Sequence, residues 1–259
     1  MRRPSPEEIE AFCERYKVTP QAAWRDYLQL RLAEASSRDE QLFNLCIWKG
    51  AFVMRFILQS SRASGDLDAT VGTDRDAVDA TRIRTKLKAA CQDLDIDIPR
   101  ETLDERDDSL SFAPIRWTDP DIGTVYTSID LSLRENLVLA PHRRRIDAIL
   151  LPAFDILHID LNEQAAEKMR CLAERTKVGD AHDVFLLWEA RTHLDHDVIR
   201  KVVPKKLTSG RNHTEEALKR LERRRELWAG QRGRELPLDA PSAEEMFTAC
   251  KAAIDQWLL

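Results

Sequence analysis

The sequence predicts an α+β fold, in which a mixed sheet flanked by helices is followed by an all-helical C-terminal lobe. Up to Pro152, segments that alternate polar and apolar residues are mixed with segments of helical periodicity. Beyond Pro152, long helical periodicity dominates. Strands mixed with helices, followed by helices, are typical of two lobes. We therefore expect an N-terminal domain over residues 1–152 and a helical domain over residues 153–259.

The N-terminal lobe is predicted to begin with helices. Ser5-Pro6-Glu7-Glu8 combines an N-cap residue, a proline at the first helical position and acids in the first turn, so we expect a helix to about Tyr16. Thr19-Pro20-Gln21 opens a second helix in the same way. Apolar spacing then predicts a third helix over 40–45, a short strand or turn over 47–50, and a helix over 51–59.

The rest of this lobe is predicted to supply most of the sheet. Residues 66–71 alternate acidic and apolar side chains, which indicates a strand. A helix is expected over 74–91, and further strands over 94–98, 109–117 and 124–133, with a turn at 119–123. The C-terminal lobe is predicted to contain helices over 162–175, 181–194, 197–203, 214–231 and 242–258.

Composition predicts a cytoplasmic protein that does not enter a membrane. The 259 residues are 43% hydrophobic and 33% charged, with a formal net charge of −5. No apolar run approaches the roughly 18 residues that a membrane span needs, and Met1-Arg2-Arg3-Pro4 leads into an acidic helix instead of a signal peptide. The five cysteines are dispersed singly, which is typical of reduced thiols and argues against a zinc site.

The most informative segment is Arg62-Ala63-Ser64-Gly65-Asp66-Leu67-Asp68. Asp66 and Asp68 are two residues apart on a predicted strand, so their carboxylates face the same way and could share a divalent cation. Gly50, a short helix earlier, would let the backbone approach a phosphate. Hard oxygen ligands and a small-residue cradle are the parts of a metal-dependent nucleotidyl-transfer site. The alternative for an isolated Asp-x-Asp is a solvated strand end.

A local excess of positive charge lies between Arg200 and Arg234. This stretch contains twelve Lys and Arg residues and four Glu residues before Glu235, although the whole chain is acidic. Such a surface suits a phosphate-rich polymer. The alternative is a solvated helix that carries i,i+4 ion pairs, such as Glu215 with Lys219.

Two groups of residues form ordered motifs. The first reads W-K-G-A-F-V-M-R over residues 48–55, followed by R-A-S-G-D-L-D over 62–68. The second reads A-A-E-K-M-R-C-L-A-E-R over 165–175, followed by G-D-A-H-D-V over 179–184. Together they resemble the AbiEii family of toxin nucleotidyltransferases and the related MenT toxins, over roughly Leu42 to Trp188. The pattern departs from the family at Ala51, where a second glycine is expected, and at Gly179, where an arginine is expected.

The resemblance implies a site of the polymerase-beta type in the N-terminal lobe. Asp66 and Asp68 would bind the metal, with Asp130 on a neighbouring strand as the third catalytic carboxylate. The alternative for Asp130 is a strand-end acid that faces water. The residues expected to contact the nucleotide phosphates in this part of the chain are Lys49, Gly50, Arg62 and Ser64.

The second motif implies further site residues in the helical lobe. Lys168 would contact the nucleotide, and the alternative is a surface lysine paired with Glu167 or Glu174. Asp180 is expected to have a catalytic role. Asp183 is instead expected to be structural, as an acid in the first turn of a helix.

The function implied by the resemblance is transfer of a nucleotide from an NTP, with Mg²⁺ or Mn²⁺, by a toxin of a toxin–antitoxin or abortive-infection system that has a cognate antitoxin. The expected acceptor is the 3′ end of tRNA, which the basic stretch fits. The alternatives are transfer to a protein or small-molecule hydroxyl, and a degenerate member that binds RNA or a partner without catalysis.

Overall fold

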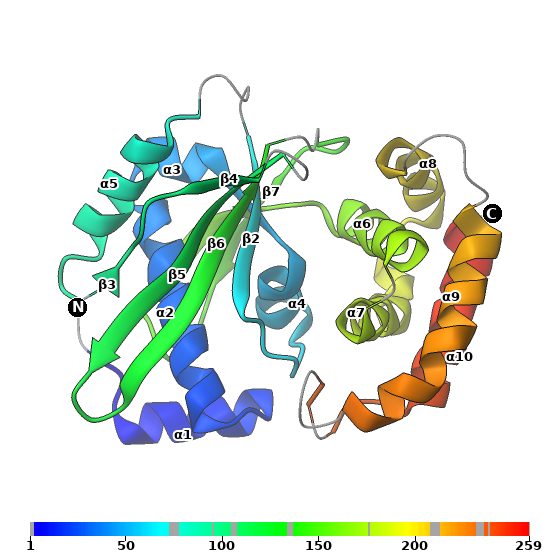
Figure 1. Cartoon of the computed structure of the whole chain (residues 1–259), viewed down its shortest axis with the longest axis horizontal. Coiled ribbons are helices and arrows are strands. Elements are labelled where there is room, and N and C mark those ends of the chain that lie inside the picture. The colour runs from blue at the N-terminus through cyan, green and yellow to red at the C-terminus, as the bar shows by residue number, and fades with distance from the viewer. Residues whose placement is uncertain are drawn as a thin grey trace. The chain divides into compact units, whose positions relative to one another are not determined.

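The chain folds into two compact units in a computed structural model (Figure 1). The structure describes residues 3–72, 78–94, 96–104, 108–133, 137–175, 177–207, 213–231, 236–237 and 239–258. Unit 1 comprises Met1–Gln59, Ala63–Leu137 and Pro141–Ile159, and unit 2 comprises Ser60–Arg62, Val138–Ala140 and Asp160–Leu259. The expected boundary after residue 152 falls inside unit 1, before its last strand.

Unit 1 begins with the predicted helices. They are α1 (Pro6–Tyr16), α2 (Pro20–Ser37), α3 (Glu40–Leu45), α4 (Gly50–Leu58) and α5 (Ala80–Ala90). At the start of α1, the Ser5 hydroxyl accepts a hydrogen bond from the Glu8 N–H at 3.3 Å, and the Glu8 carboxylate accepts one from the Ser5 N–H at 2.7 Å. Helix α5 begins later than expected, after the N-cap Asp79, and residues 73–77 lie outside the described part of the chain.

The sheet of unit 1 is mixed and has eight strands. They are β1 (Cys46–Lys49), β2 (Asp66–Val71), β3 (Ile96–Asp97), β4 (Thr102–Asp104), β5 (Ser109–Asp119), β6 (Gly123–Ser132), β7 (His142–Ile146) and β8 (Phe154–His158). Their order is β3-β5-β6-β2-β1-β8-β7, and β4 pairs with β5. Strand β2 is antiparallel to β1 and parallel to β6. The predicted mixed sheet is confirmed, and β2 lies near its centre.

Four strands, β3, β4, β7 and β8, differ from the sequence-based prediction, and β4 was not expected. The expectation of helices alone beyond Pro152 is wrong, because β8 follows it and pairs parallel with β1. Strand β7 pairs antiparallel with β8 and was not predicted, because its residues His-Arg-Arg-Arg-Ile lack polar–apolar alternation. The strand expected over 94–98 is short, since β3 contains Ile96 and Asp97.

Helix α2 packs against one face of the sheet and thereby leaves the other face for polar residues. The Gln29 side chain of α2 donates a hydrogen bond to the Thr127 hydroxyl of β6 at 3.1 Å, and α2 passes behind β5 and β6 in Figure 1. Leu67 of β2 and Ile129 of β6 are buried. Because side chains alternate along a strand, the residues next to them point to the opposite face.

Unit 2 contains the predicted C-terminal helices, with shifted ends. They are α6 (Leu161–Glu174), α7 (Val178–Glu189), α8 (His196–Lys206), α9 (His213–Trp228) and α10 (Ala243–Trp257), with the 3₁₀ helices η2 (Arg191–His193) and η3 (Ala229–Gln231). A buried ammonium joins α8 to α6, since Lys206 Nζ lies 2.5 Å from Glu163 and 2.9 Å from Glu167. Among the described helices, none combines the length and the apolar character of a membrane span.

Candidate functional site

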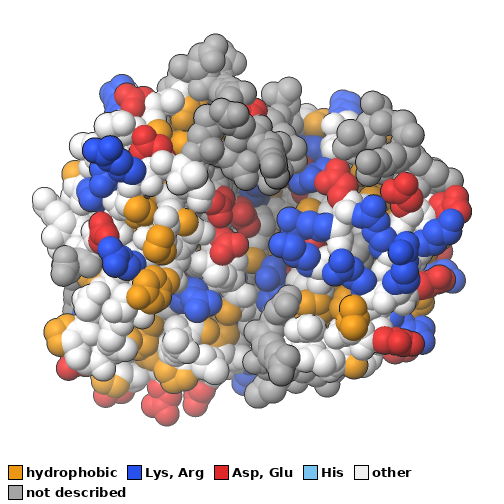
Figure 2. Space-filling model, viewed as in Figure 1, with side chains coloured by type: hydrophobic (Ala, Val, Ile, Leu, Met, Phe, Trp, Pro, Cys, Tyr) orange, Lys and Arg blue, Asp and Glu red, His pale blue; other side chains and the backbone are white. Residues whose placement is uncertain are grey.

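Three of the predicted metal-binding carboxylates lie on two neighbouring strands of unit 1. Asp66 and Asp68 are on β2, and Asp68 is directly opposite Asp130 of β6 in the parallel pairing. Partners in register share a face of the sheet, so all three side chains point away from the buried Leu67 and Ile129. Asp66 is exposed, whereas Asp68 and Asp130 are half-buried. Acidic side chains gather over this part of the sheet in Figure 2.

Asp66, Asp68 and Asp130 together form an acidic row. Lys49 and Gly50 lie beside this row, where β1 ends and α4 begins. Lys49 is the last residue of β1 and lies opposite Asp68 in the antiparallel pairing. Gly50 follows with φ +66°, and a Cβ atom at this position would lie 2.3 Å from Asp68 Oδ2. Only a glycine fits this conformation and this clearance. The neighbour that Gly50 admits here is the Asp68 carboxylate, and the predicted approach of a phosphate to Gly50 stays a prediction.

The segment before β2 is held by hydrogen bonds within unit 1. The Ser64 hydroxyl accepts a hydrogen bond from the Asp66 N–H at 3.3 Å. The Ser64 carbonyl accepts one from Gln29, and the Gly65 carbonyl accepts one from the Thr127 hydroxyl at 2.9 Å. A hydroxyl that accepts a hydrogen bond keeps its own proton for a further acceptor. Ser64 is thus fixed at the start of the acidic strand and remains able to donate to a phosphate.

The acidic row suits a divalent cation in its chemistry. Carboxylate oxygens are the ligands that Mg²⁺ and Mn²⁺ prefer, and the missing Cβ at Gly50 leaves room beside the Asp68 carboxylate. Within the described residues, however, no three His, Cys, Asp or Glu side chains converge closely enough to hold a metal ion. The structure therefore brings Asp66, Asp68 and Asp130 to one face without drawing them into a closed ligand cluster.

The site residues predicted in unit 2 form a buried ionic cluster. Lys168 Nζ of α6 lies 2.7 Å from Asp183 Oδ2 and 3.4 Å from Asp180 Oδ1, and both aspartates are on α7. The alternative that Lys168 is a surface lysine paired with Glu167 or Glu174 is wrong. Its side chain is 9% exposed, and both glutamates bind Arg170 instead.

Arginines complete the cluster. Arg62, in the short segment of unit 2 that follows α4, binds Asp183 through Nε at 3.1 Å and Nη2 at 2.9 Å. Arg175 binds Asp180 through Nε at 2.9 Å and Nη2 at 3.0 Å. A Cβ at Gly179 would lie 3.2 Å from Arg62 Nη1. The glycine found where the family pattern has an arginine therefore leaves room for the guanidinium of Arg62.

The cluster keeps all of its members charged. Burial alone would raise the pKa of Asp183, but the charges of Arg62 and Lys168 outweigh it and hold that pKa below its ordinary value of 3.8. Burial alone would lower the pKa of Lys168, but Asp183 and Asp180 raise it above 10.5. Asp183 was expected to be a first-turn acid, but Asp180 holds that position in α7. Asp183 lies in the next turn and pairs with two cations, and Asp180 shares this environment.

Sequence reasoning did not identify Arg175 as a member of the cluster. Its position five residues before Asp180 is a weak signal, because a helix end and a helix start separate the two residues. The sequence-based interpretation also treated the basic residues between Arg200 and Arg234 as one surface. Arg225 points away from its neighbours on α9, since it lies 3.2 Å from Glu244 and its guanidinium carbon is 5.0 Å from the ring centroid of Phe247.

Comparisons with known proteins show the family and the fold of the chain. The family model of the AbiEii nucleotidyl transferase toxin of type IV toxin–antitoxin systems matches residues 32–254. MenT4, a nucleotidyltransferase toxin from Mycobacterium tuberculosis H37Rv, is similar in structure, with a TM-score of 0.63 and 16% sequence identity over 96% of this chain and 89% of that chain. This likeness concerns the fold. No curated protein sequence matches the chain. Because the family model covers most of its length, the chain belongs to the AbiEii family of nucleotidyltransferase toxins.

Proposed function

We propose that this toxin transfers a nucleotide from an NTP to the 3′ end of tRNA, with a divalent cation bound at the acidic row of unit 1. One observation carries the proposal. Lys49, Asp68 and Asp130 are register partners on three adjacent strands, and Gly50 packs directly against the Asp68 carboxylate. This arrangement brings carboxylate oxygens, an ammonium and the N-terminus of a helix to one place on the sheet.

The acidic row and the residues beside it have distinct proposed roles. Mg²⁺ or Mn²⁺ held by Asp66, Asp68 and Asp130 would neutralise charge on the phosphates and on the attacking hydroxyl. The backbone at Gly50 presents the N-terminus of α4, where N–H groups and the helix dipole favour an anion. Lys49 adds a point charge, and the Ser64 hydroxyl donates to a phosphate oxygen.

Lys168 of unit 2 was expected to contact the nucleotide. Because Asp183 and Asp180 already hold its buried ammonium, we propose instead that it stabilises the ionic cluster. We assign Asp180 to this arrangement and not to proton transfer, because its oxygens are already bound by Arg175. Arg62 is likewise assigned to holding Asp183, in place of the expected phosphate contact.

A tRNA acceptor is favoured over the alternatives by charge. Lys and Arg side chains gather over α9 and its neighbours in unit 2 (Figure 2), which suits a polyanion. A protein or small-molecule hydroxyl would gain little from such a surface. A degenerate, non-catalytic member is disfavoured because Asp66, Asp68 and Asp130 are all present on one face. We place the reaction in the cytoplasm, where a cognate antitoxin would restrain it, with abortive infection as one setting.

The test is to incubate the purified protein with each of the four NTPs, Mg²⁺ or Mn²⁺ and deacylated tRNA, and to follow tRNA length. We expect lengthening with at least one NTP, and loss of lengthening when EDTA is added. Asp66→Asn and Asp68→Asn should each lower the rate by about 100-fold or more. Parallel reactions with protein and small-molecule acceptors identify the alternatives. Full activity of both variants would refute the acidic row as the site.

A further inference from the structure

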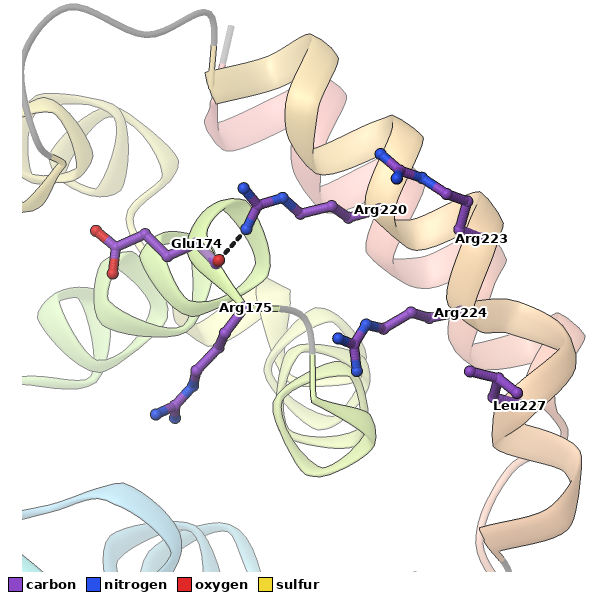
Figure 3. Close-up of a pocket in the computed structure, with 6 residues that line it drawn as sticks. All are labelled: Glu174, Arg175, Arg220, Arg223, Arg224 and Leu227. Atoms are coloured by element: carbon purple, nitrogen blue, oxygen red, sulfur yellow. Dashed lines mark hydrogen bonds between the residues drawn. The ribbon is translucent and has the colours of Figure 1, made fainter.

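An open groove in unit 2 is lined by residues from the end of α6 and from one side of α9. Its volume is about 770 Å³, and its lining residues are Glu174, Arg175, Arg220, Arg223, Arg224 and Leu227. Figure 3 shows the side chains of Arg220 and Arg224 reaching from α9 toward the end of α6. All of these residues belong to unit 2.

The groove carries a clear excess of positive charge. Four arginines and one glutamate are among its lining residues. The Glu174 carboxylate is bound by Arg170 Nη1 at 2.7 Å, and it points away from the groove in Figure 3. Within the described part of the chain, Arg224 has no ion pair or side-chain hydrogen bond, and Arg223 donates to the Lys219 carbonyl. The charge of these two arginines is therefore available to a ligand.

The arrangement of the arginines favours an extended ligand over a single phosphate. Arg220, Arg224 and Leu227 follow one another at intervals of four and three residues, so they form a row along one face of α9. A rise of about 1.5 Å per residue separates the first two by about 6 Å along the helix axis. Arg220 is held by the Glu174 carbonyl and Glu216. Figure 3 shows the guanidinium groups of Arg223 and Arg224 pointing in different directions, so these two do not converge on one phosphate. They can each contact a successive phosphate of a polymer.

An apolar side chain lies at the end of the same row. Leu227 is 63% exposed, although large hydrophobic residues are normally covered in a folded protein. Unstacked bases can stack on the planar guanidinium groups beside it, and the leucine adds apolar contact area. Phosphates and bases together are the chemistry of a single-stranded polynucleotide.

We infer that this groove binds the sugar-phosphate backbone of a single-stranded part of the RNA acceptor, an inference that rests on the proposed function. Arg223 and Arg224 bind phosphates, and Leu227 contacts a base. The groove thereby positions the acceptor and takes no part in the chemical step.

A binding experiment without catalysis tests the inference. Fluorescently labelled deacylated tRNA is titrated with the full-length protein in EDTA at several salt concentrations. The parent is compared with Arg223→Gln/Arg224→Gln and with Arg225→Gln, a matched control on the same helix that binds Glu244 outside the groove. Melting temperatures show whether each variant is folded, and a fluorescent NTP titration without EDTA tests nucleotide binding.

We expect the double variant to bind tRNA at least about ten-fold more weakly. Its slope of log K against log salt should be smaller by about 1.4, as the loss of two phosphate contacts to a single strand predicts. Arg225→Gln should bind like the parent, and NTP binding should be unchanged in both variants. Equal tRNA binding by the double variant and the parent would overturn the inference. Equal weakening of NTP and tRNA binding would also overturn it, because the groove would then be a nucleotide site.

Failure of this inference is distinguishable from failure of the proposed function. If the parent extends tRNA and the double variant does so with an unchanged Michaelis constant, the reaction stands and the groove is excluded. If the parent binds tRNA through the groove but none of the four NTPs supports its extension, the inference about the groove stands and the proposed reaction is excluded.

Discussion

Unit 1 and unit 2 each contain a pair of aspartates close in sequence, and the two pairs differ in what surrounds them. Asp66 and Asp68 lie on a strand, with one side chain exposed and the other half-buried. Asp180 and Asp183 lie on a helix, are buried, and are each bound by an arginine and by Lys168. A carboxylate that already holds two cations has little capacity for a metal ion. The difference fits the proposal that the first pair binds a metal ion, and it shows that the second pair is engaged in ion pairs within unit 2.

The largest expected loss of stability comes from removing one aspartate of the pair in unit 2, Asp183. Asp183→Ala leaves Lys168 and Arg62 without their shared carboxylate in a buried site, so the free energy of unfolding should fall by about 3–5 kcal/mol. Urea unfolding followed by circular dichroism measures this change. Asp255→Ala, on the exposed side of α10, is the matched control and should stay within about 0.5 kcal/mol of the parent. A stability of Asp183→Ala equal to that of the control would remove the distinction between the two pairs.

A smaller loss of stability is expected when Lys168, the cation shared by Asp180 and Asp183, is removed. Lys168→Met retains most of the side-chain volume, but it leaves Asp180 and Asp183 facing each other with one arginine apiece. The free energy of unfolding should fall by about 1–3 kcal/mol. Lys251→Met, at an exposed position of α10, controls for the loss of a lysine. Unchanged urea midpoints for both variants would mean that the ammonium contributes nothing to the fold and is available for substrate alone.

Acid should weaken the same cluster. The pKa values of Asp180 and Asp183 are lower in the folded protein than their ordinary value of 3.8, so the unfolded chain binds more protons. Their contribution is complete well above pH 3.8 and is lost as the pH falls through and below that value. At pH 3 the loss is at most about 1.2 kcal/mol for each carboxylate, a bound set by the ordinary pKa of 3.8. Urea midpoints between pH 7 and pH 3 measure it, and Asp183→Asn should flatten the curve. A parent curve that matches the variant would contradict the lowered pKa.

The smallest effect on stability is expected in unit 1. Asp66 is exposed at the start of β2, so Asp66→Asn should change the free energy of unfolding by no more than about 0.5 kcal/mol. Nucleotide transfer should nevertheless be lost. Thermal unfolding and the tRNA-lengthening assay, carried out on the same preparation, measure the two properties. Destabilisation by several kcal/mol would show that this aspartate also holds the fold together.

Local patterns predicted the parts of the fold that depend on neighbouring residues. The capping residues of α1 and the alternation in β2 are short-range signals, and both elements are confirmed. Strand β7 lacks such a signal, because four polar residues in succession are tolerated at an exposed sheet edge. The Asp-x-Asp spacing indicated the shared face of Asp66 and Asp68, which the structure contains.

Long-range pairing could not be predicted from the sequence. Arg62 and Asp183 are 121 residues apart, and no local pattern links them. The same limit applies to the basic stretch. Arg224 and Arg225 are adjacent and identical in type, but successive residues of a helix point about 100° apart. One of them lines the groove, and the other binds Glu244.

The division of the chain into units has a consequence for how the protein could be cut or synthesised. A fragment that begins at Asp160 contains α6 to α10, but it lacks Arg62, which binds Asp183. It also lacks Val138 and Leu139, whose N–H groups donate to the buried Glu163 at 2.9 Å and 2.7 Å. The helical unit is therefore discontinuous in sequence. During synthesis, Arg62 leaves the ribosome long before its carboxylate partner, so the ionic cluster closes only when translation of the toxin is well advanced.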